Sequence, residues 1–266
     1  MSSYETITYE KQSRVATVTF ARPERRNALD TQVCTEVIDA MRTAESDPDV
    51  LCVVLTGEGS VFCAGQNLRF TFSSNPQAYE EYRRVNRRMR DTIQKLEQPV
   101  IARVQGDAIG GGTYIATCCD LVVAVKEARF AMREINAGVH SGGAHLFTVG
   151  RARSMEMNLL GRYVSAVEAE RWDLINRAVE PEELDATIDD FVQTILALPP
   201  LAVSYTKFGT NLLLDMAGYY AWLDAHVGIH PSLPWTEDGK EAKRAFLEKR
   251  EPRFTGRISA TGDEPT

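Results

Sequence analysis

The chain has 266 residues, and 30 Lys and Arg stand against 37 Asp and Glu, so its formal net charge at pH 7 is −7. Hydrophobic residues make up 44% of the chain and charged residues 25%, which excludes intrinsic disorder and fibrous repeats and suits one large globular unit. The acidic balance argues against a nucleic-acid partner. No apolar run approaches the roughly 20 residues that cross a bilayer, and the N-terminal residues are too polar for a secretory signal. We therefore expect a cytoplasmic protein with no membrane partner.

Strand and helix patterns alternate along the first part of the chain. Residues 6–20 alternate and are rich in β-branched side chains on both sides of a turn at 11–13, which predicts a β-hairpin. Asp30 then precedes a helical pattern and is a typical capping residue. The following segments predict a buried strand, a helix and two more buried strands, at 50–55, 78–96, 99–106 and 120–125. This alternation predicts a layered α/β core.

The pattern changes after Pro199 and Pro200. From there to about Lys249 the apolar residues recur only at helical spacing, and Thr236 is a plausible helix cap followed by two acidic residues. We therefore divide the chain into a core at 1–199, a helical region at 200–258 and a flexible tail at 259–266.

Two glycine-rich turns each follow a predicted strand, at 57–68 and 106–112. Glycine in a strand-to-helix turn lets backbone N–H groups point outward, and the start of the next helix adds partial positive charge. Two such turns side by side would hold one developing oxyanion between two N–H donors. Each turn by itself is also typical of an ordinary tight turn, and neither has the spacing of a phosphate-binding loop.

Five segments, taken in chain order, resemble the crotonase family of enoyl-CoA hydratases and isomerases: Arg22–Leu29, Ala64–Leu68, Gly110–Gly112, Phe130–Asn136 and Phe246–Phe254. The resemblance covers nearly the whole chain. It implies an α/β fold of the ClpP/crotonase type, a spiral of ββα units in which residues 200–258 form a helical trimerisation region. It also implies a homotrimer, or a hexamer built as a dimer of trimers.

The same resemblance implies a site for an acyl-CoA thioester within residues 1–199. The backbone N–H groups of Gln66 and Gly111 would form an oxyanion hole that polarises the thioester carbonyl and stabilises an enolate. Glu134 would be the general acid/base, and partial burial would raise its pKa toward the working pH. No metal or redox cofactor is implied. Substrate contacts are implied for Arg26, Ala28, Ala64, Asn67, Leu68, Gly110, His140, Phe246 and Lys249.

Tyr114 stands where hydratases of the family commonly carry another glutamate. A phenol that titrates near pH ~10 is not a base at neutrality, so we expect Tyr114 to orient the substrate or to pack. A single carboxylate favours a double-bond shift, because one base can take a proton at C2 and return it at C4.

Two other functions remain open. Hydration or hydratase-lyase chemistry on a non-standard acyl group is one alternative, because a hydratase-lyase branch of the family works with one glutamate and a hydroxyl residue at the position of Tyr114. The alternative of another class is a catalytically weak acyl-CoA-binding protein. Within the altered loop at 138–145, His140 and Ser141 would support hydrolysis only with an Asp from elsewhere, and no nucleophile motif surrounds this serine.

Several further signals favour structural roles. His226 and His230 are four apart on a predicted helix but lack a third metal ligand. A basic stripe of Arg83, Arg84, Arg87 and Arg88 is flanked by acidic residues, which favours a solvated or intersubunit helix over an RNA-binding one. The five cysteines have no metal-finger spacing, and we expect them to be reduced and mostly buried.

Overall fold

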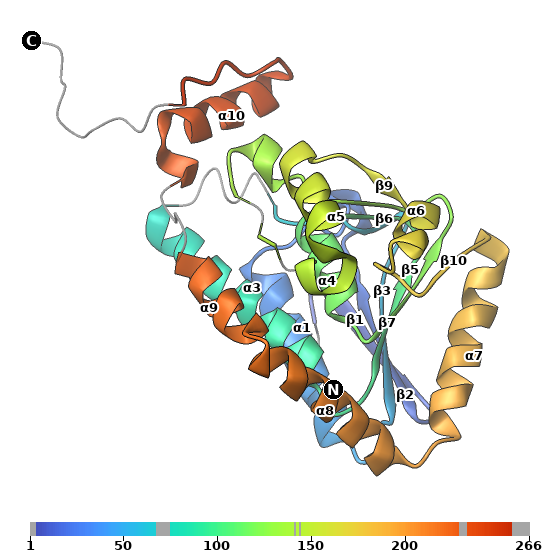
Figure 1. Ribbon diagram of the computed structural model, residues 1–266. Coiled ribbons are helices and arrows are strands. Elements are labelled where there is room, and N and C mark those ends of the chain that lie inside the picture. Colours follow the sequence, from blue (N-terminus) through green and yellow to red (C-terminus); the bar gives the residue numbers. More distant parts are fainter. Residues whose placement is uncertain (1–3, 68–74, 141, 144, 229–232, 257–266) are drawn as a thin grey trace, which may run out of the picture.

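The computed structural model describes residues 4–67, 75–140, 142–143, 145–228 and 233–256 (Figure 1). Within these residues the strands form two sheets. The larger sheet has six strands in the order β1-β2-β3-β5-β7-β10, and the smaller has four in the order β4-β6-β8-β9. The predicted α/β class is confirmed.

The N-terminal hairpin consists of β1 (Ile7–Gln12) and β2 (Val15–Phe20), which pair antiparallel with Ile7 opposite Phe20. Every second residue of β2 is buried, as its alternating sequence predicts. The turn is centred one residue later than predicted, because Ser13 adopts the left-handed conformation with φ of 56°. The hairpin prediction is confirmed.

The chain then repeats one ββα unit three times, and each repeat adds one strand to each sheet. The strand pairs are β3 (Cys52–Gly57) with β4 (Val61–Cys63), β5 (Val100–Val104) with β6 (Asp107–Ile109), and β7 (Leu121–Val125) with β8 (Arg129–Ala131). Because β4, β6 and β8 are parallel neighbours, the segments that follow them leave the small sheet at the same edge. The short β9 (Val164–Ser165) pairs antiparallel with β8, and β10 (Arg177–Val179) pairs parallel with β7.

Helices cover the large sheet on both faces, with α1 (Thr31–Ser46) and α3 (Pro76–Lys95) on one and α7 (Leu184–Leu196) on the other (Figure 1). The predicted cap of α1 is confirmed, because Asp30 accepts a hydrogen bond from the Val33 N–H at 3.1 Å. The remaining helical elements up to α7 are η1 (Pro23–Arg25), α4 (Gly111–Cys118), η2 (Glu134–Ala137), α5 (Leu146–Leu160), α6 (Ala166–Arg171) and η3 (Pro181–Glu183).

The C-terminal region is helical, as predicted: α8 (Pro200–Met216), α9 (Tyr219–Gly228), η4 (Leu233–Trp235) and α10 (Glu237–Glu248). Thr236 caps α10 by accepting from the Gly239 N–H at 3.1 Å. Helix α8 contributes no buried residue and exposes large apolar side chains, namely Leu201, Tyr205, Phe208, Leu212, Leu213 and Met216. The predicted tail at 259–266 lies outside the described residues.

All five cysteines are buried and free of disulfide bonds, as predicted. The basic stripe of α3 differs from its prediction at Arg87, which is only 7% exposed. Arg87 pairs with Asp91 on the same helix and with Asp224 of α9 at 3.0 Å. In the described part of the chain no single helix is long and apolar enough to cross a membrane, although the bent pair 181–196 and 200–216 passes that test together.

Candidate active site

The two glycine-rich turns meet at the edge where β4 and β6 end. A Cβ at Gly65 would lie 2.9 Å from the Gly111 nitrogen, and one at Gly111 would lie 3.7 Å from the Gln66 nitrogen. Gly65 is required for this approach, because a Cβ there would also lie 2.4 Å from the Ile109 carbonyl oxygen and because its φ is 78°. The expected pairing of the Gln66 and Gly111 amides is therefore a close contact between two chain segments that are far apart in sequence.

The directions of the Gln66 and Gly111 N–H groups are set by the backbone around them. Leu29 donates to the Gly65 carbonyl and accepts from the Asn67 N–H, each at 2.8 Å. These bonds flank Gln66, so its own N–H faces away from Leu29, as in any parallel bridge. Gly111 is the first residue of α4, where an N–H has no partner inside the helix and carries the positive end of the helix dipole.

Glu134 lies against the same turn. It begins η2 directly after β8, and a Cβ at Gly110 would lie 2.7 Å from its Oε1. Gly110 has φ of 54° and donates its N–H to the Ala131 carbonyl at 2.6 Å, which ties the turn to the end of β8. The carboxyl group therefore sits beside the paired amides because β4, β6 and β8 end together.

The Glu134 carboxyl group is more buried than the residue as a whole. The residue is half-buried, yet Oε2 is inaccessible and has no hydrogen-bond partner among the described residues. Burial raises its pKa to about 7, against the opposing effects of a backbone hydrogen bond and the positive charge of Arg90. A carboxyl group with that pKa exchanges protons readily near neutrality.

Tyr114 is buried on α4 and donates its hydroxyl hydrogen to the Gly142 carbonyl at 2.7 Å. Its ring stacks on His145 with centroids 5.1 Å apart. Burial and the nearby Glu134 carboxylate raise the pKa of the phenol. Tyr114 is thus a neutral group that anchors the loop before α5, and its hydroxyl is already committed to a carbonyl.

His145, at the end of this loop, is also buried. The Thr117 hydroxyl donates its hydrogen to the Thr113 carbonyl at 2.9 Å and lies 3.1 Å from His145 Nε2. Because that hydrogen is already used, we infer that Nε2 carries the hydrogen of the contact with Thr117. The buried Nδ1 has no partner among the described residues, and burial lowers the pKa of the imidazole to about 4. His145 is neutral and structural, and the nearby His140 is half-buried and has its own contacts.

The loop around Arg26 adjoins the turn that carries Ala64 and Gln66. The Ala64 N–H donates to the Arg26 carbonyl at 3.0 Å, and the Arg26 side chain is exposed. Asn27, which the sequence analysis did not single out, holds the loop: it is 2% exposed, and its Nδ2 donates to the Glu58 and Val61 carbonyls. Ala28 is half-buried beside it. Asn67 is half-buried at the end of this turn, and Leu68 lies outside the described residues.

Helix α10 packs against the element that carries Glu134. A Cβ at Gly138, the C-cap of η2, would lie 2.9 Å from the Gly239 Cα, so the two backbones nearly touch. Phe246 and Lys249 lie at the end of this helix and are exposed, with Lys249 in the left-handed conformation at φ of 53°.

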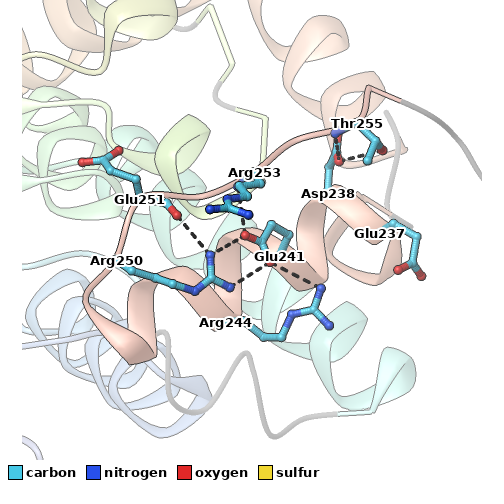
Figure 2. Close-up of a pocket in the computed structure, with 8 residues that line it drawn as sticks. All are labelled: Glu237, Asp238, Glu241, Arg244, Arg250, Glu251, Arg253 and Thr255. Atoms are coloured by element: carbon cyan, nitrogen blue, oxygen red, sulfur yellow. Dashed lines mark hydrogen bonds and ion pairs between the residues drawn. The ribbon is translucent and has the colours of Figure 1, made fainter.

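A polar hollow of about 560 Å³ lies between α10 and the segment that follows it (Figure 2). Glu241 accepts both arms of the Arg250 guanidinium, at 2.5 and 3.0 Å, and the Arg253 N–H at 2.9 Å. Asp238 accepts from the Thr255 and Gly256 N–H groups, each at 2.7 Å. The Asp238 and Glu241 carboxylates thus hold residues 250–256 against α10, and Glu241 forms the ion pair with Arg250.

Arg90 is a residue of the site that sequence analysis missed. It projects from α3, and its guanidinium carbon lies 5.1 Å from the centroid of the Tyr114 ring. The stripe pattern had drawn attention to the other arginines of this helix. Only the packing of α3 on α4 places Arg90 beside Tyr114.

Comparisons with known proteins identify the family of this chain. The enoyl-CoA hydratase/isomerase family model matches residues 10–257. The chain belongs to this family. It is 32% identical over 265 residues to a probable enoyl-CoA hydratase of Mycobacterium bovis, covering 96% of this chain and 100% of that protein. It is also 33% identical over 255 residues to the (E)-benzylidenesuccinyl-CoA hydratase of Thauera aromatica, covering 94% and 99%.

Solved structures of the crotonase family share the fold. The crystal structure of an enoyl-CoA hydratase from Mycobacterium avium subsp. paratuberculosis superposes with a TM-score of 0.85 at 30% identity, over 95% of this chain and all of that chain. An enoyl-CoA hydratase/isomerase from Xanthobacter autotrophicus gives the same TM-score and identity, over 92% and 93%. The predicted crotonase-like spiral and family membership are confirmed.

Proposed function

We propose that this member of the family moves a double bond in an enoyl-CoA thioester. The observation that carries the proposal is a single buried carboxyl group, Glu134, beside the paired amides of Gln66 and Gly111, with neutral Tyr114 at the place of another carboxylate. The amides bind the thioester oxygen, which lowers the energy of the enolate. No cofactor beyond the CoA of the substrate is needed for this chemistry.

The reaction then uses one base twice. Glu134 takes a proton from C2 of a 3-enoyl-CoA, and the electron pair delocalises onto the thioester oxygen between the two amides. The same carboxyl group returns the proton at C4, which places the double bond between C2 and C3. A pKa of about 7 suits both steps, because the group is a base in one and an acid in the other.

Hydration is the second candidate, and the names of relatives favour it. The Mycobacterium bovis relative is named a probable enoyl-CoA hydratase, and a Syntrophomonas wolfei relative with 31% identity is named a crotonyl-CoA hydratase. For hydration the same carboxyl group would have to deprotonate water, because the Tyr114 hydroxyl hydrogen is already donated to the Gly142 carbonyl.

Product analysis separates the two reactions. Purified protein is given a 3-enoyl-CoA and, separately, short-chain and aromatic 2-enoyl-CoA thioesters, with Glu134→Gln and Tyr114→Phe alongside. We expect Glu134-dependent formation of 2-enoyl-CoA from the first, and we expect Tyr114→Phe to retain most of that turnover. A 3-hydroxyacyl product from the second would instead establish hydration. Tight binding that Glu134→Gln leaves unchanged, without turnover of any thioester, would point to a binding protein.

We also propose that α8 contributes to a homotrimer or hexamer. Six large apolar side chains on this helix are between 47% and 78% exposed: Leu201, Tyr205, Phe208, Leu212, Leu213 and Met216. Such a surface is typical of a protein interface. Light scattering should report a multiple of three chains, and Phe208→Asp should shift the mass toward one chain.

A further inference from the structure

Arg90 is a half-buried arginine of α3 for which the described residues provide no anionic partner. Arg83 and Arg84 pair with Glu80 at 3.6 and 3.3 Å, Arg87 pairs with Asp91 and Asp224, and Arg88 is exposed to solvent. Arg90 is half-buried, and its Nε is inaccessible and has no hydrogen-bond partner among the residues that the structure describes. None of its nitrogens has a carboxylate oxygen of a described residue within ion-pairing distance.

The surroundings of Arg90 are mostly aromatic and weakly polar, apart from the Glu134 carboxyl group, whose pKa the charge of Arg90 lowers without forming an ion pair. Its guanidinium lies over the Tyr114 ring, and its charge acts on Tyr82, Cys118 and Tyr219 by lowering their pKa values against burial. A ring face compensates a guanidinium only in part. A partly buried guanidinium is costly unless an anion pairs with it, so this environment is suited to an anion that arrives with a ligand.

The position of Arg90 relative to Gly111 indicates which part of a bound acyl-CoA would lie near it. Gly111 and Tyr114 are three residues apart on α4 and therefore lie on one face of the helix. The thioester carbonyl of a bound acyl-CoA would lie at Gly111, and its α carbon at Glu134. An acyl chain that continued from there along this face of α4 would pass Tyr114 and then meet Arg90.

We propose that the acyl chain of the substrate ends in a carboxylate, and that Arg90 binds this carboxylate. The inference rests on the proposed function of the site, because it takes the oxyanion hole as the place of the thioester. A guanidinium forms two parallel hydrogen bonds with a carboxylate, which a methyl group at the same place does not accept. Arg90 is thereby a specificity-determining residue at the end of the chain opposite to CoA.

Matched pairs of saturated thioesters test the proposal without turnover. Glutaryl-CoA is compared with pentanoyl-CoA, and adipyl-CoA with hexanoyl-CoA, by isothermal titration calorimetry. Within each pair the CoA is identical, so its contribution cancels in the ratio of dissociation constants. We expect the carboxylate-ended thioester of at least one pair to bind about tenfold tighter or more, as a charged hydrogen-bonded pair provides.

Variants of α3 assign the preference to one residue. Arg90→Gln should abolish it, Arg90→Lys should keep part of it because the charge remains without the planar fork, and the exposed Arg88→Gln should keep all of it. Circular dichroism checks that each variant is folded. Equal or tighter binding of the methyl-ended thioester in both pairs by the unaltered protein would overturn the proposal, and that result does not depend on any variant.

The outcomes also separate this inference from the proposed function. Turnover of 3-hexenoyl-CoA with no preference for carboxylate-ended thioesters would leave the isomerase proposal intact and remove the role of Arg90. An Arg90-dependent preference without turnover of any enoyl-CoA would support the carboxylate site and contradict the isomerase. A preference that survives in folded Arg90→Gln would place the anion elsewhere and contradict the assignment.

Discussion

Burial and the positive charge of Arg90 have opposite effects on the pKa of Glu134. Burial against Gly110 and the turn of α4 removes water from the carboxyl group and raises its pKa to about 7. The charge of Arg90 lowers the pKa but forms no ion pair with the carboxylate. The result is a group that is half protonated near neutrality and remains able to take up a proton.

The pH dependence of turnover follows from this pKa. Because the base must be ionised in the free enzyme, we expect kcat/KM for a 3-enoyl-CoA to rise with pH through about 7 and to level off above it. Above pH 7, Glu134→Gln should lower kcat/KM by about 10²- to 10⁴-fold, and the exposed Glu127→Gln should not change it. A profile that is flat between pH 6 and 8 would contradict the assignment of Glu134 as the base.

Gly110 is the residue whose replacement most directly displaces the carboxyl group. In Gly110→Ala the new Cβ would lie 2.7 Å from Glu134 Oε1, at a φ of 54° that alanine adopts only with strain. We expect kcat to fall by about 100-fold or more, as for a misplaced catalytic group. Gly150→Ala is the matched control, because Gly150 also has a positive φ, of 72°, and nothing lies within 4 Å of its Cβ position. Equal kcat values for the two variants would show that Gly110 does not position Glu134.

At the scale of elements, α10 connects the C-terminal segment to the site. Its Gly239 touches Gly138 at the end of η2, and its carboxylates Asp238 and Glu241 hold the chain that follows it. Hydrogen bonds from the Arg250 side chain and the Arg253 N–H lower the pKa of the Glu241 carboxyl group to about 2, against the opposing effect of burial. Glu241 is therefore ionised throughout the physiological pH range and able to accept these hydrogen bonds.

Amide hydrogen exchange tests this attachment. Asp238→Ala removes the acceptor of the Thr255 and Gly256 N–H groups, so we expect these amides to exchange at least tenfold faster. Glu237→Ala is the control: it removes a neighbouring first-turn acid that pairs only with the exposed Lys240 in the described structure. If the two variants exchange alike at 255 and 256, the Asp238 contacts do not order this segment.

At the scale of the whole molecule, two buried titratable groups act oppositely on stability. Glu134 has a folded pKa near 7, above its ordinary 4.5, so its ionisation costs stability between pH 4.5 and 7 and the full cost applies above 7. His145 has a folded pKa near 4, below its ordinary 6.5, so stability is lost as pH falls from 6.5 to 4. Between pH 4.5 and 6.5 the two effects partly cancel.

Removing the ionisable carboxyl group exposes this balance. Glu134→Gln should raise the free energy of unfolding at pH 8 by about 3–4 kcal/mol, since the pKa rises from 4.5 to about 7 and each pKa unit is worth about 1.4 kcal/mol. Near pH 4 the gain should vanish, because Glu134 is protonated in both states. Urea unfolding at the two pH values measures the difference. A gain of the same size at pH 4 would assign the effect to packing rather than to charge.

The amino-acid sequence by itself determined the local elements and the class of the site. Asp30 and Thr236 cap the helices they were expected to cap, because a cap bonds only to N–H groups two or three residues ahead. Alternation and short apolar runs likewise predicted the strands, because these patterns also depend only on residues that are close together in the sequence. The glycine turns and Glu134 were predicted as parts of one site from the order of the motifs, which the fold brings to one edge of the small sheet.

Only the tertiary structure decided which charges are buried and what they face. Arg87 lies four residues from Asp91, but its burial depends on Asp224, which is 137 residues away in the chain. Asn27 is an anchor because the turn after β3 and the start of β4 supply the carbonyl groups that accept from its Nδ2. Arg90 and the Tyr114 hydroxyl likewise depend on how α3 and the loop before α5 pack on α4. Sequence spacing describes neighbours along one element, whereas desolvation and partner choice arise from elements that meet only in the folded chain.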